Sequence, residues 1–160
     1  MATGTEREAL CGFLDQQRDA LIRKIEGLSE EDARRAATVS SMSLLSLLKH
    51  SATWERRWFQ VIVAGRVLPG EWSGEDEDGP DRTFDLADED TVASVVAHYR
   101  EQIAISREIV AGSDLSAPVA RKDLIDQNLR FVVIHMIEET ARHAGHADII
   151  RETIDGRRGL

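Results

Sequence analysis

Side chains that bind metal ions gather in one short stretch near the C-terminus. His135, Glu139, His143 and His146 follow one another at spacings of three and four residues. At about 100° per residue in an α-helix, these four side chains fall within a sector of about 80°. Imidazole nitrogens and carboxylate oxygens are ligands for divalent ions, and a set of three leaves positions open for water or substrate. The spacing therefore indicates a metal site of the catalytic kind.

The apolar residues of the same stretch define the face of the helix that is expected to be buried. His143 lies within this face and Glu139 lies at its edge, whereas Glu138 and Asp148 fall outside it and are expected to be solvated. A carboxylate that faces a core is costly unless it is paired, hydrogen-bonded or bound to a metal. The apolar face consists of Val132, Met136, Ala147, Ile150 and Ile154.

A third ligand has to come from another segment, and His50 is the candidate. It borders an apolar stripe in its own expected helix, which includes Trp54 and Trp58. These two tryptophans and Phe59 are expected in the core. With Glu139 and His143, His50 would complete a set of two histidines and one glutamate.

Plainer interpretations of the same residues stay open. A histidine that borders an apolar face is commonly a hydrogen-bonded core residue, and a Glu–His pair four residues apart is commonly a surface ion pair. His135, Arg142 and His146 flank the stripe. They are candidates for carrying protons or orienting a substrate, and the alternative is that they face solvent.

The elements that must position these residues are helical, because no useful length of the chain alternates with period two. Polar residues typical of helix N-caps precede three of the expected helices, and glycines follow most of them. A segment rich in Gly, Asp and Glu, residues 66–90, is expected to be a long crossover. The expected helices are 6–27, a short one after Ser29, 44–65 after Ser43, 92–112 after Thr91, and 128–154. This pattern predicts an all-α fold, a four-helix bundle formed by one domain over residues 1–160.

The amino-acid composition argues against several classes of partner and against a disulfide. Of 160 residues, 42% are hydrophobic, and the formal net charge is −9. This acidity disfavours a nucleic-acid partner. No apolar segment approaches the roughly 20 residues of a membrane span, and no signal peptide is evident. Cys11 is the only cysteine, so an intrachain disulfide is impossible. We expect a cytoplasmic protein without a membrane partner.

Two segments together resemble the DinB-like superfamily, and the resemblance covers most of the chain. They are LLSLLKHSATWERRWF, which contains His50, and HMIEETARHAGHADIIRETIDG, which contains Glu139 and His143. The resemblance implies a four-helix bundle with up-down-down-up topology and a long crossover between its second and third helices. It also implies a divalent metal, zinc or nickel, held by His50, Glu139 and His143. Many relatives have histidine where Glu139 stands, whereas mycothiol-dependent maleylpyruvate isomerases use a His, Glu, His set of this kind.

The resemblance implies a chemistry as well. Several DinB-like proteins are transferases or isomerases that use mycothiol, bacillithiol or glutathione. A metal that binds a thiol favours its thiolate, which is the nucleophile. Cys11 lies outside the motif, so the thiol would be a diffusible cosubstrate. We therefore expect a thiol S-transferase or isomerase that acts on a small electrophile.

Two other functions stay open at this point. One is a hydrolase, in which water replaces the thiol. The other is a non-catalytic, stress-associated or small-molecule-binding bundle, in which the metal site is structural or vestigial. The resemblance also makes a homodimer plausible, with Trp72 of the crossover as a candidate for its interface.

Overall fold

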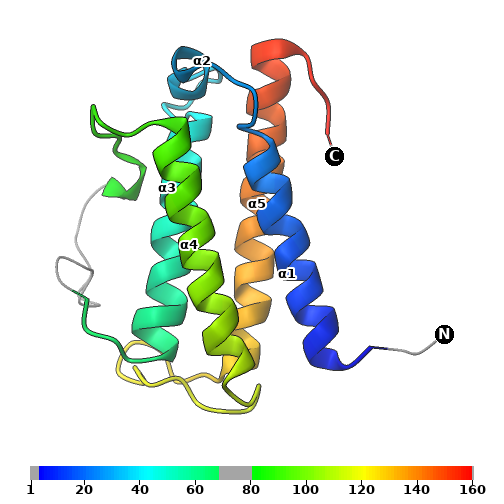
Figure 1. Ribbon diagram of the computed structural model, residues 1–160, viewed down its shortest axis with the longest axis vertical. Coiled ribbons are helices and arrows are strands. Elements are labelled where there is room, and N and C mark those ends of the chain that lie inside the picture. The colour runs from blue at the N-terminus through cyan, green and yellow to red at the C-terminus, as the bar shows by residue number, and fades with distance from the viewer. Residues whose placement is uncertain (1–3, 69–80, 160) are drawn as a thin grey trace.

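The long helices of this computed structural model, which describes residues 4–68 and 81–159, run alongside one another (Figure 1). Helix α1 packs against α5, and α3 packs against both α4 and α5. The short helix α2 lies at one end of the molecule (Figure 1). The α-helices are α1 (Glu6–Arg23), α2 (Glu30–Arg34), α3 (Leu44–Arg56), α4 (Val92–Ala111) and α5 (Leu129–Asp155). No β-strand occurs in the described ranges, so the prediction of an all-α fold is confirmed.

The predicted N-caps are confirmed. In each case the side-chain oxygen of the capping residue accepts a hydrogen bond from the backbone N–H of the third residue that follows, which satisfies a donor that the helix leaves free. The predicted caps are Ser29 for α2, Ser43 for α3 and Thr91 for α4; Asn128, which was expected as the first residue of the last helix, caps α5 in the same way. Helix α1 ends earlier than predicted, at Arg23, and turns lead from there to Gly27.

The second long helix differs from the prediction. It was expected to be one regular helix to Gly65, but α3 ends at Arg56 and continues as the π-helical segment η1 (Arg57–Val63). A π-helix closes its hydrogen bonds over one more residue than an α-helix, so a period of 3.6 does not describe this segment. Gly65 does end it, at φ +66°, where an added Cβ would lie 2.9 Å from the Cβ of Ala120.

The end of the predicted crossover is ordered and lies against α3. It contains the short 3₁₀-helix η2 (Arg82–Phe84), which contacts α3. Residues 69–80, and with them Trp72, lie outside the described residues. Within the described part of the chain, no helix is long and apolar enough to cross a membrane.

A buried ion pair separates two apolar clusters of the core. One cluster includes Leu45 and Tyr99, and the other includes Phe59 and Val132. Between them, Arg18 of α1 donates to both carboxylate oxygens of Glu55 of α3. Only 3% of the Arg18 residue and none of Glu55 is exposed. The pair therefore joins α1 to α3 away from solvent.

The ring of Tyr99 on α4 belongs to the first apolar cluster, but its hydroxyl group interacts with the ion pair and with the Thr140 side chain of α5. Arg18, Glu55, Tyr99 and Thr140 thus form a buried polar cluster. Burial, and then the nearby Glu55 carboxylate, raise the pKa of Tyr99 well above its ordinary value, although Arg18 and the Thr140 side chain oppose the shift. Tyr99 thus stays a neutral phenol at physiological pH. Each long helix contributes one residue to this cluster.

Replacement of one partner of the buried pair should be strongly destabilising. We expect Glu55→Ala to lower the free energy of unfolding by about 3–5 kcal/mol, because it leaves the Arg18 guanidinium buried with one fewer counter-charge. Urea denaturation measures this value. Glu138→Ala is the matched control: it removes an exposed ion pair with Arg142 and should change stability by less than about 1 kcal/mol. Equal losses in the two variants would contradict this account of the core.

Candidate functional site

A cavity of about 310 Å³ lies between α3 and α5, and all three predicted metal ligands line it. His50 comes from α3, whereas Glu139 and His143 come from α5, one turn apart. The ring centroids of His50 and His143 are 4.9 Å apart, with the rings nearly perpendicular. The structure therefore brings together in one cavity residues that lie about 90 positions apart in the sequence.

The two ring nitrogens of His143 differ in their polar partners. His143 Nε2 lies 3.9 Å from Glu139 Oε2. His143 Nδ1 is buried and has no hydrogen-bond partner among the described residues. An orphaned buried nitrogen costs roughly 1–3 kcal/mol, so this atom is one that a ligand in the cavity could satisfy.

Glu139 has a competing partner. Its Oε1 accepts from Arg142 Nη1 at 2.8 Å, and the same guanidinium donates to Glu138 Oε1 at 2.7 Å. In the described ranges, no group of three or more His, Cys, Asp or Glu side chains is arranged so that it could hold a metal ion. The donor types suit a divalent ion, but their arrangement is not that of a formed metal centre.

Of the histidines that line the cavity, the two predicted metal ligands, His50 and His143, are neutral at physiological pH. Burial lowers the pKa of His50 to about 4, with smaller effects from His143 and Arg57 in the same direction and an opposing effect from Asp81. Burial also lowers the pKa of His143, and Glu139 only partly opposes it. A metal ligand must be the neutral imidazole, so desolvation keeps both rings in the form that binds.

The three candidates for proton transfer lie in different surroundings. His135 lines the cavity and contacts Trp58, at 4.5 Å between ring centroids. His146 is exposed on α5 and does not line this cavity. Arg142 does not line it either, and is held by the two glutamates. The interpretation of His146 and Arg142 as solvent-facing residues fits their exposure.

Several cavity residues were missed or misread in the sequence. Trp54 and Trp58 were expected in the core with Phe59. Phe59 is fully buried, and Trp58 packs against the same apolar cluster, but both tryptophans also line the cavity. Asp81 lines it as well. The spacing of Asp81 and Thr83 is typical of a local side-chain turn, which signals a bend but not its place in the fold.

The neutral state of His50 predicts a loss of stability in acid. In the unfolded chain this imidazole takes up a proton near pH 6.5, whereas the folded protein resists protonation until about pH 4. The free energy of unfolding should therefore fall as the pH decreases through this window, by about 3 kcal/mol from His50 alone. In His50→Gln this contribution should vanish, while that of His143 remains.

Urea denaturation of chelator-treated protein at pH 7 and pH 4.5 measures the difference. The control is His98→Gln, which removes an imidazole whose side chain is 44% exposed. An acid-induced loss as large in His50→Gln as in the wild type would refute the prediction.

Comparison with known proteins supports the fold and identifies the family of this chain. One solved structure with a similar fold, described as the conserved protein of a locus from Enterococcus faecalis, has a TM-score of 0.69 and 11% sequence identity. The match covers 97% of this chain and 100% of that chain, and at this identity it bears on the fold alone. No curated protein matches the chain.

The model of the mycothiol S-transferase family matches residues 9–156, which include all three predicted ligands. This family is DinB-like, so the resemblance identified in the sequence is confirmed. The chain belongs to the mycothiol S-transferase family.

Proposed function

We propose that this protein is a divalent-metal-dependent S-transferase that joins the sulfur of mycothiol to a small electrophile. The observation that carries the proposal is the convergence of His50, Glu139 and His143 on one cavity in a chain of the mycothiol S-transferase family. We further propose that residues 1–160 form a single DinB-like bundle with up-down-down-up topology. A homodimer and a cytoplasmic location stay predictions.

The residues present suit a metal ion by their chemistry. His50 and His143 are neutral imidazoles, and His143 Nδ1 lacks a partner among the described residues. Glu139 would complete the set on release from Arg142, whose guanidinium keeps Glu138 as a second partner. Zinc and nickel both accept this donor set. When bound, such an ion supplies Lewis acidity, which lowers the pKa of a coordinated thiol.

The chain's own residues have three tasks in this reaction. Glu139 and the two histidines hold the ion, and the indoles of Trp54 and Trp58 present apolar walls to the electrophile. The thiol loses a proton, sulfur forms a bond to the electrophilic carbon, and the leaving group departs with its electron pair. His135 is the proposed acceptor of the thiol proton, since it lines the cavity and is not in the ligand set.

A non-catalytic bundle is the second candidate. The observation that favours it is the ion pair between Glu139 and Arg142, which satisfies the carboxylate without any metal. On that account His50 and His143 are structural, as buried neutral rings commonly are.

Metal content and thiol transfer together test the proposal. We expect untagged protein supplied with zinc or nickel to hold close to one ion per chain, measured by elemental analysis. His143→Ala should lose most of this metal and reduce transfer of mycothiol to 1-chloro-2,4-dinitrobenzene at least about 100-fold. The exposed His98→Ala should retain both properties. A metal-free protein with no thiol-dependent activity would leave the non-catalytic bundle as the function.

The indoles of Trp54 and Trp58 that line the cavity predict a preference for apolar electrophiles. Trp58→Ala should raise KM for the aryl chloride about tenfold, equivalent to about 1.4 kcal/mol of lost contact, and change KM for iodoacetamide much less. Steady-state kinetics with both electrophiles measure the difference. Phe13→Ala removes a 57% exposed aromatic ring on α1 and serves as the control. Equal changes in KM for the two electrophiles would contradict a role for the indole in recognition.

A further inference from the structure

The imidazole of His50 is held by residues from the end of the crossover. Its Nδ1 lies 2.6 Å from Thr83 Oγ1 and 3.4 Å from Asp81 Oδ2. The ring of Phe84 stacks on it at 3.9 Å between centroids, with 11° between the planes. Three residues of one short segment therefore fix both the plane and one edge of the imidazole. In the described part of the chain, the hydrogen bond to Thr83 and the close contact with Asp81 both use Nδ1 of His50, not Nε2.

The hydrogen-bond directions assign the proton on this ring. The Asp81 carboxylate is ionised at neutral pH and can only accept. Thr83 donates its backbone N–H to Asp81 Oδ1 at 2.9 Å and its hydroxyl to the same oxygen at 2.5 Å. The single hydroxyl proton of Thr83 is thereby used, so Thr83 Oγ1 must accept from His50. Nδ1 then carries the imidazole proton, and Nε2 keeps its lone pair.

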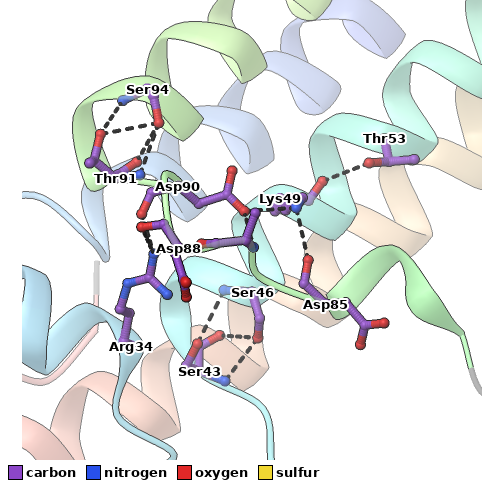
Figure 2. Close-up of polar contacts among 11 residues, drawn as sticks. Arg34, Ser43, Ser46, Lys49, Thr53, Asp85, Asp88, Asp90, Thr91 and Ser94 are labelled. Atoms are coloured by element: carbon purple, nitrogen blue, oxygen red, sulfur yellow. Dashed lines mark hydrogen bonds and ion pairs between the residues drawn. The ribbon is translucent and has the colours of Figure 1, made fainter.

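Cations on α2 and α3 hold this segment in place. Lys49, the residue before His50, donates to the backbone oxygen of Asp85 at 2.8 Å and to Asp90 Oδ2 at 2.7 Å (Figure 2). Arg34 of α2 donates to the backbone oxygens of Ala87 and Asp90. The Lys49 contacts fix the chain that follows Thr83 to α3, the helix that carries His50, and the Arg34 contacts fix it to α2.

We infer that Asp81 and Thr83 are positioning residues that hold His50 as the Nδ1–H tautomer and so present Nε2 as the nitrogen available to a ligand in the cavity. The part that concerns a bound metal rests on the proposed function. The tautomer itself does not, since it follows from hydrogen bonds within the chain. A histidine that binds metal through one nitrogen is commonly oriented by a hydrogen bond from the other.

Nitrogen-15 NMR of the histidine side chains tests the tautomer in chelator-treated, metal-free protein at pH 8, where an imidazole is neutral. We expect the signals of His50, assigned from their loss in His50→Gln, to be those of a ring protonated at Nδ1. Thr83→Val removes the acceptor and should shift the population towards Nε2–H. Asp81→Ala should act in the same direction, because the Thr83 hydroxyl becomes free to donate to Nδ1.

Two variants complete the design. Thr83→Ser keeps the hydroxyl and should restore the wild-type tautomer. Thr53→Val removes a hydroxyl of α3 that donates to the backbone oxygen of Lys49, and should leave His50 unchanged. A wild-type ring protonated at Nε2, or a tautomer that does not respond to Thr83→Val and Asp81→Ala, would overturn the inference.

Zinc affinity separates this inference from the proposed function. In competition with a chromophoric chelator, Thr83→Val should bind zinc about 10–100-fold more weakly than the wild type and than Thr53→Val. Unaltered affinity in Thr83→Val would overturn the role of Thr83 at the metal. If the wild type binds no zinc but has the expected tautomer, the metal-dependent function fails, whereas the hydrogen-bond assignment is supported.

Discussion

The ion pair between Arg18 and Glu55 is the constraint on which the rest of the structure depends. It is buried, and it lies where α1, α3, α4 and α5 each contribute a polar residue between two apolar clusters. A buried charge tolerates little displacement from its partner, because a lost contact is not replaced by water. The pair therefore fixes the height at which α1 and α3 face each other, and α5 packs against both of these helices. Thr140 of this cluster and Trp54, the residue before Glu55, line the candidate site, so the relative position of α3 and α5 at the cavity depends on the packing around the pair.

Helix starts and helical faces could be predicted from the sequence because they depend on residues only a few positions apart. Ser43 and Asn128 begin helices through hydrogen bonds to backbone groups three residues away, and the stripe around His143 follows from a regular helical period. The π-helical segment after Arg56 could not be predicted in this way. The longer hydrogen-bond spacing of a π-helix leaves no signal in the amino-acid composition, since apolar residues such as Phe59 and Ile62 occur in α-helices and π-helices alike.

The candidate site was predicted only in part, for a related reason. His50, Glu139 and His143 lie on helical stripes whose directions the sequence gives, and they line one cavity. Thr83 and Asp81 reach the site from an irregular segment, and no periodicity relates position 83 to position 50. The ion pair between Arg142 and Glu139 was missed as well, because spacing shows which side chains are neighbours but not which of two partners a carboxylate takes.

The docking of the crossover onto α3 has a thermodynamic consequence. His50 has its hydrogen-bond partner only while the segment with Thr83 lies against it, so docking and occupancy of Nε2 are coupled equilibria. Such coupling is reciprocal: whatever free energy the docked segment adds to ligand binding, the ligand returns to docking. The side chains of Lys49 and Arg34 donate to the end of the crossover and do not line the cavity, so they would act on the cavity through the crossover. With a ligand at Nε2, as the proposed function requires, the segment would act as an intramolecular effector of the site.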